Sequence, residues 1–278
     1  MKFVIDVSKW QPPASLPWNK FAAGAHGLIA RASYGTMRDE QMLEHLKRAR
    51  AAGLKVGVYS FYRPSQPVRA QLDVLLAQLD LAKIGPGDIV PTLDVELDPK
   101  PSPQPVTKAW QDGVRQMLAA LKDRFGNAMV YITQREFGML GAPEWLLTFP
   151  LWVANYTSAP KPATPGNRQW TGWQFRVGPF DPNGAGGYDK AHPDLDQSHF
   201  VDLPLIGALP YLPPVPQPEP TNESDDGLAE AIALHDQHLI DTFVETEAEQ
   251  IAQQGAAAAD REYETHDTDP AGPPEDAA

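Results

Sequence analysis

The chain has 278 residues, 42% of them hydrophobic and 21% charged, which is enough for one large α/β domain or two small ones. It has no cysteine, which excludes disulfides and thiolate metal sites, and no apolar run near the roughly 20 residues that span a bilayer. The N-terminal MKFVIDVSKW lacks the apolar core of a secretion signal, so we expect a soluble protein with no signal peptide and no membrane insertion.

The excess of acidic charge lies in the C-terminal quarter of the chain. The net charge is -13, yet residues 213–278 hold 17 acidic residues and one basic residue, which leaves 22 basic and 19 acidic residues in 1–212. The total argues against nucleic acid as a partner. The mildly basic body is compatible with an anionic surface such as a cell wall.

Short β-branched or aromatic runs alternate with helical stretches, a pattern typical of a parallel α/β sheet. In chain order, we expect strands at 3–8, 27–33, 55–61, 88–96, 128–133, 151–156, 171–175 and 194–200. Helical periodicity marks 18–23, 40–52, 68–83, 107–124 and 135–147. Five βα units followed by three strands predict an irregular TIM-like (β/α)5β3 barrel over 1–208. A doubly wound open sheet competes, although no glycine-rich dinucleotide fingerprint supports it.

Three further segments follow the predicted barrel. Residues 209–224 are rich in proline and indicate an extended linker. In 225–254 apolar residues recur at helical spacing on an acidic background, which predicts an amphipathic helix. This helix either binds a protein partner, self-associates, or packs loosely on its own barrel. Residues 255–278 are expected to be disordered.

The segment PTLDVE carries the clearest candidates for catalysis. Asp94 and Glu96 are two residues apart, so in a strand both side chains face the same side, about 6.6 to 6.8 Å apart along the chain. Barrel enzymes place catalytic groups at the C-terminal ends of their strands. Two carboxylates in one pocket raise the pKa of one of them, which supplies the acid that glycoside hydrolysis needs. An acidic pair in a solvated loop is the alternative.

Acidic residues also lie at the first and last predicted strands. Asp6 ends the first strand, and Asp194 and Asp196 lie in the eighth. In a closed barrel these strands are neighbours, so Asp6 and one of the other two are expected beside Asp94 and Glu96. Asp6 alone is also explained as a helix cap or as a partner of Arg31.

Aromatic and amide side chains are candidates for binding a sugar polymer, since sugar rings stack on aromatic faces while their hydroxyls bind amides and carboxylates. Packing in the core is the alternative for each single aromatic. The histidines show no metal-ligand spacing, and no cofactor is expected. The candidate substrate contacts are Tyr62, Trp152, Trp173, Tyr34, Tyr131, Gln11, Asn155 and Asp196.

The ordered series IDVSKWQ, IARASYG, GVYSFYRP, PTLDVE, VYITQ, LWVANY and WQF resembles glycoside hydrolase family 25, the Chalaropsis-type lysozymes that include many phage endolysins. The resemblance covers about 1–205 and implies a β-1,4-N-acetylmuramidase on a (β/α)5β3 barrel. It implies that Glu96 is the general acid and that Asp94 stabilises charge and orients a substrate N-acetyl group. Asp6 matches the acid after the first strand, and Asp194 matches the last acid, although DLD replaces the usual D-x-N. Ser60 stands where many members carry histidine.

Bacterial peptidoglycan is therefore the expected partner. We expect synthesis in the host cytoplasm and action on the wall after holin-type release, or transport in a virion. A chitinase-like glycosidase and a non-catalytic peptidoglycan-binding or virion structural protein are the competing functions. The choice between retention and inversion stays open, and substrate assistance by the N-acetyl group is the preferred hypothesis.

Overall fold

The computed structural model describes residues 1–96, 107–190 and 195–208. The predicted linker, acidic helix and disordered tail lie outside the described residues. Among the described helices, none combines the length and apolarity that a membrane crossing requires.

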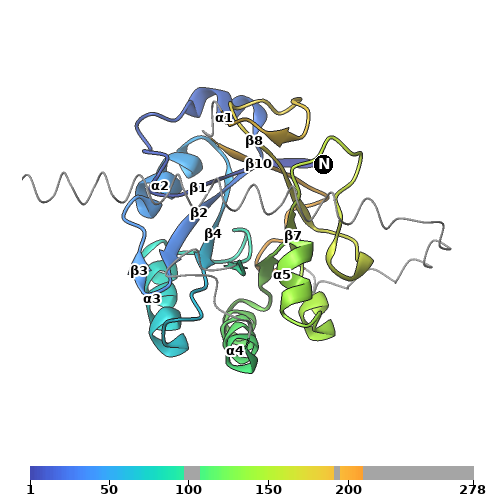
Figure 1. Cartoon of the computed structure of the whole chain (residues 1–278). Helices are drawn as coiled ribbons and strands as arrows, with labels where there is room; N and C mark the ends of the chain where they lie inside the picture. Colours follow the sequence, from blue (N-terminus) through green and yellow to red (C-terminus); the bar gives the residue numbers. More distant parts are fainter. Residues whose placement is uncertain (97–106, 191–194, 209–278) are drawn as a thin grey trace, which may run out of the picture. The chain divides into compact units, whose positions relative to one another are not determined.

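Eight strands close into a barrel, which confirms the predicted architecture and rules out the open sheet (Figure 1). Each strand pairs with the next, and the last pairs with the first. Two short strands, β3 (Met37–Arg38) and β9 (Gly187–Tyr188), extend the sheet beside β2 and β8. In order around the barrel, the strands are β1 (Lys2–Val7), β2 (Gly27–Tyr34), β4 (Lys55–Phe61), β5 (Thr92–Asp94), β6 (Met129–Tyr131), β7 (Leu151–Ala154), β8 (Gly172–Val177) and β10 (Asp196–Phe200).

The last strand of the barrel runs against the others. From β1 to β8 neighbouring barrel strands are parallel, whereas β10 is antiparallel to both β8 and β1. The sequence predicts a strand here but not its direction. Because β10 is reversed, its first residues lie at the end of the barrel where the other seven strands finish.

Helices lie on the outside of the strands (Figure 1). The longest, α4, begins where the Thr107 side chain accepts a hydrogen bond from the Trp110 N–H, and ends at Gly126 with φ 79°. The predicted helix 135–147 is divided, since Gly141 and Ala142 have φ of 77° and 48°. The helices are α1 (Trp18–Gly24), α2 (Met42–Ala51), α3 (Val68–Leu81), α4 (Lys108–Phe125) and α5 (Gln134–Met139), with 3-10 turns η1 (Glu144–Thr148) and η2 (Pro165–Asn167).

Large side chains fill the barrel interior below the carboxylates and pack closely against glycines of the strands. A Cβ on Gly172 would lie 2.5 Å from the ring of Phe200, and one on Gly57 would lie 2.9 Å from Cβ of Ile89. Trp152 packs beside Phe200 and is 1% exposed. The interior is therefore a packed core below the carboxylates, as in barrels generally, and not a pore.

Candidate active site

Four carboxylates gather where the parallel strands end. Asp6, near the end of β1, pairs directly with Asp196, the first residue of β10. Asp94 ends β5, and Glu96 lies two residues further along the chain. Charge interactions link Glu96 to both Asp6 and Asp94, and Asp196 to Asp6. The predicted grouping of acids from the first, middle and last strands is therefore present in the structure.

Burial raises the pKa of Asp6, Asp94 and Asp196, and repulsion by neighbouring carboxylates adds to the shift for Asp6 and Asp94. Desolvation is the main cause for Asp6, followed by the charges of Asp196 and Glu96, and it places the pKa well above its ordinary value. The pKa of Asp94 is raised in the same way, by desolvation and then by Glu96 and Asp6. Desolvation raises the pKa of Asp196 to about 7, against a lowering hydrogen bond from Tyr156. The site therefore holds protons on carboxyl groups near neutral pH.

Gln174, at the middle of β8, connects several of these groups. Its Nε2 donates to Oδ1 and Oδ2 of Asp6 at 3.1 and 3.0 Å. Its Oε1 accepts hydrogen bonds from the hydroxyls of Tyr131, at 2.8 Å, and Tyr156, at 2.5 Å. The sequence predicts Tyr131 as a substrate contact, whereas in the structure its hydroxyl is committed to this network.

Asp94 is 5% exposed, and its Oδ1 has no hydrogen-bond partner among the described residues. Arg31 lowers its pKa, whereas Glu136 in α5 raises it. Arg31 itself is held by Asp39, with Nε 2.9 Å from Oδ2. Arg31 and Asp39 thus form a buried ion pair beside the acids.

Sequence reasoning missed two residues of this region. Tyr59 in β4 is partly exposed and interacts electrostatically with Asp6, Asp94 and Asp196. Glu136 is 4% exposed and lies close enough to raise the pKa of Asp94. Side chains alternate between the two faces of a strand, so in KVGVYSF the residues Gly57 and Tyr59 share one face. This alternation could have identified Tyr59 from the sequence. A single glutamate in a short helix gives no such signal.

Three aromatic residues expected to bind sugar are buried and make contacts within the protein. Trp152 donates from Nε1 to Ser198 Oγ at 3.0 Å inside the barrel. Trp173, 7% exposed, alternates with Gln174 along β8 and so faces away from the acids. The hydroxyl of Tyr62 lies against Gly113 of α4, 2.0 Å from where a Cβ would be. Their burial favours the core alternative, and a role in binding sugar stays a prediction for all three.

The remaining predicted contacts have local roles or lie at the rim. Tyr34 is partly exposed, packs on Phe61 and has the Arg63 guanidinium over its ring. Gln11 Oε1 accepts from the Ser8 N–H at 2.9 Å, which fixes the turn after β1. The Asn155 carbonyl accepts from Trp173 Nε1 at 2.7 Å.

Of the two candidates for the last acid, Asp196 falls in the described part of the chain, and it pairs with Asp6. Asp194 lies outside the described residues. Ser60, which stands where many family members carry histidine, is buried, and its hydroxyl shares a 2.8 Å hydrogen bond with that of Ser33.

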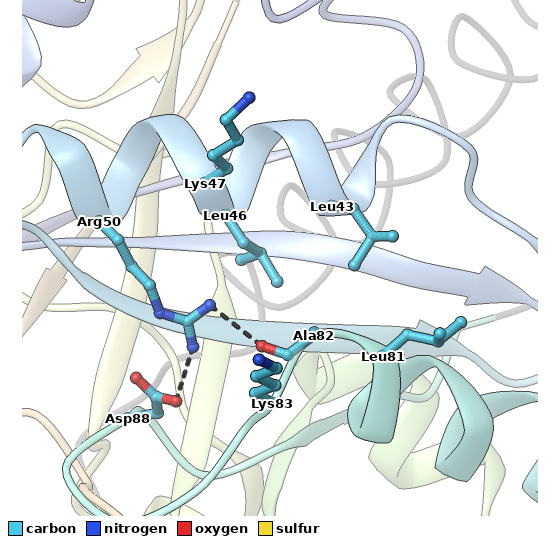
Figure 2. Close-up of a pocket in the computed structure, with 8 residues that line it drawn as sticks. All are labelled: Leu43, Leu46, Lys47, Arg50, Leu81, Ala82, Lys83 and Asp88. Atoms are coloured by element: carbon cyan, nitrogen blue, oxygen red, sulfur yellow. Dashed lines mark hydrogen bonds and ion pairs between the residues drawn. The ribbon is translucent and has the colours of Figure 1, made fainter.

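A surface groove of about 380 Å³ lies apart from the carboxylates, between α2 and the end of α3 (Figure 2). Leu43, Leu46 and Leu81 line it, and Arg50 crosses it to bind Asp88 and the Ala82 carbonyl. Both helices cover the outside of the barrel, so this groove does not contain the acids described above.

No group of three or more histidine, cysteine, aspartate or glutamate side chains within 1–96, 107–190 and 195–208 has the arrangement of a metal site. A pair in which one carboxyl group keeps its proton and another is an anion is what glycosidases use.

Comparisons with known proteins agree with this geometry. The model of the glycosyl hydrolases family 25 matches residues 5–178. The bacterial lysozyme from Streptomyces coelicolor is 25% identical, with a TM-score of 0.58 over 73% of this chain and 93% of that chain. The muramidase from Trichobolus zukalii is 24% identical, with a TM-score of 0.58 over 73% and 94% of the two chains. A family 25 glycosyl hydrolase from Bacillus anthracis is 18% identical, with a TM-score of 0.57 over 73% and 89%. No curated protein matched the chain in sequence.

Proposed function

Since this chain belongs to glycosyl hydrolases family 25, we propose that it is a lysozyme that cleaves the β-1,4 bond between N-acetylmuramic acid and N-acetylglucosamine in bacterial peptidoglycan. The main observation that supports this proposal is the convergence of four carboxyl groups at one end of a closed barrel, those of Asp6, Asp94, Glu96 and Asp196. The 25% identical lysozyme, matched over 93% of its own length, supports the same substrate class.

In the proposed reaction, Glu96 is the general acid. It lies just beyond β5 and is partly exposed, so a sugar polymer at the barrel mouth can reach it. Its proton passes to the glycosidic oxygen as the bond from that oxygen to C1 breaks, and positive charge develops on the sugar ring. Carboxylate anions beside the ring stabilise that charge, in a site largely shielded from water.

Asp94 is proposed to orient the substrate. Its buried Oδ1 has no protein partner among the described residues, so it is available to accept a hydrogen bond from the N–H of an N-acetyl group. That contact directs the acetyl oxygen to C1, where it displaces the leaving sugar. Water then opens the resulting ring and returns a proton to Glu96.

The test is digestion of purified peptidoglycan by the intact protein and by Glu96→Gln, with mass spectrometry of the soluble products. We expect fragments that end in N-acetylmuramic acid from the intact protein and none from the variant. Chitin is the second substrate: cleavage of chitin with peptidoglycan spared would replace this proposal with a chitinase-like activity. Binding to peptidoglycan without release by a folded protein would replace it with a structural role.

The biological setting that we propose is phage lysis, either as an endolysin released by a holin or as a lysin carried in the virion. The mildly basic charge of residues 1–212 supports approach to an anionic wall. Expression in a susceptible host with and without a holin tests this. Lysis that needs the holin supports the endolysin role, and lysis without it contradicts that role.

A further inference from the structure

The hydrogen bonds of Gln174 define the orientation of its amide. The side chain is 3% exposed, and both ends of the amide are occupied. An ionised carboxylate only accepts, whereas a tyrosine hydroxyl both donates and accepts, so the amide nitrogen, which donates, is the end that faces Asp6. The amide oxygen then faces the two tyrosine hydroxyls, which donate to it.

Gln174 binds Asp6, a carboxyl group whose surroundings include groups that raise its pKa and groups that lower it. Asp196 lies directly beside Asp6 on β10, and Glu96 and Asp94 approach it from the end of β5. Tyr59 faces it from β4, and Tyr156 from beyond β7. The charges of Asp196 and Glu96 disfavour a negative charge on Asp6, whereas the hydrogen bond from Gln174 and a backbone hydrogen bond favour it. The Gln174 Nε2 lies 3.1 and 3.0 Å from the two Asp6 oxygens, so its N–H is shared between them and fixes the direction in which the carboxyl group faces.

We propose that Gln174 is a positioning residue for the glycosidase reaction: its amide holds the Asp6 carboxylate in one orientation, and the hydroxyls of Tyr131 and Tyr156 hold the amide. The expected effect of Gln174 on catalysis rests on the proposed function. Its effect on the orientation and titration of Asp6 does not, because that is a property of the folded protein alone.

The two tyrosines contribute differently. The Tyr131 hydroxyl bonds Gln174 and also interacts with the Tyr156 hydroxyl, whereas Tyr156 interacts with Asp196 as well and lowers its pKa. A tyrosine hydroxyl has one hydrogen to donate, so Gln174 and Asp196 compete for the hydrogen of Tyr156. Tyr131 is therefore the position at which the support of the amide is tested.

The experiment compares the full-length protein with Gln174→Met, which keeps the length of the side chain and removes both amide bonds, and with Tyr131→Phe, which removes one hydroxyl. Gln78→Met is the matched control. Gln78 is also buried, at 4% exposed, but it lies in α3 and donates to the Ala32 carbonyl outside the acid cluster. Two measurements are made on each: kcat and KM against pH, and a 13C NMR titration of the Asp6 carboxyl carbon.

For Gln174→Met we expect kcat to fall on the order of tenfold or more with KM little changed, since a lost charge-assisted bond acts on the reacting geometry. The acidic limb of the pH profile and the Asp6 titration should both move to higher pH. Tyr131→Phe should shift both in the same direction by less. Gln78→Met should lower thermal stability and leave both unmoved.

An Asp6 titration that is unchanged in Gln174→Met and in Tyr131→Phe overturns the inference, as does an equal shift in Gln78→Met. If Gln174→Met does not fold, Tyr131→Phe decides alone. If the intact protein releases nothing from peptidoglycan, the proposed function fails, and the NMR titration still decides whether Gln174 governs Asp6.

Discussion

The stability of Asp196→Asn relative to that of wild type should be higher at alkaline pH than at acidic pH. The pKa of Asp196 is about 7, raised from 3.8 mainly by desolvation. Because the folded state binds this proton more tightly than the unfolded chain, its contribution is complete below pH 4 and is lost as pH rises through 7. The interval of about three units, at about 1.36 kcal/mol each, corresponds to about 4 kcal/mol. Asp196 is partly exposed, so screening by solvent reduces the expected effect to roughly 2 kcal/mol.

Urea denaturation of wild type and Asp196→Asn at pH 4.5 and pH 8 measures this difference. We expect the variant to gain about 2 kcal/mol relative to wild type between the two pH values. Asp202→Asn is the control, because Asp202 is exposed and close in sequence but lies outside the cluster. A stability difference between Asp196→Asn and wild type that is the same at both pH values would refute the reasoning, as would an equal pH effect in Asp202→Asn.

Three further predictions concern the scaffold. Gly113→Ala should lower the free energy of unfolding by about 1–3 kcal/mol, because its Cβ would lie 2.0 Å from the Tyr62 hydroxyl; adding Tyr62→Phe should restore part of the loss in urea melts, and no recovery would contradict the contact. Asp39→Asn should cost about 3 kcal/mol, because it leaves Arg31 with its buried partner neutralised; a calorimetric Tm equal to wild type would contradict this. A chain that ends at Leu212 should stay folded and active, and loss of soluble protein or of peptidoglycan release would show that the barrel depends on residues 213–278.

The positions of the strands and of the acids were predictable because both arise from local patterns. Alternation and strand length identify β1 and β5, and an acid at the end of a strand then falls at the barrel mouth without further information. Asp6 and Asp94 are located in this way. Their raised pKa values result from the same placement, because grouping acids in a barrel interior both buries them and brings them together.

The direction of β10 and the use of the aromatics were not predictable, because each depends on contacts between distant segments. A strand pattern is the same read in either direction, so nothing in 194–200 indicates that it runs against its neighbours. Trp152 and Trp173 lie on barrel strands, but burial within the sheet decides their roles, and sequence position does not. The bonds of Gln174 likewise join β1, β6 and β8.

The reversed final strand also determines at which end of the barrel the chain leaves it. After β10 the backbone returns to the start of β5, where the Val90 N–H donates to the Pro204 carbonyl and the Ile206 N–H to the Asp88 carbonyl. Residues 203–208 thus run at the floor of the barrel, opposite its catalytic mouth. Were β10 parallel, the chain would leave beside the acids. For protein engineering, a fusion joined at this point begins at the end of the barrel opposite the four acids, so modules can be exchanged there away from those carboxyl groups.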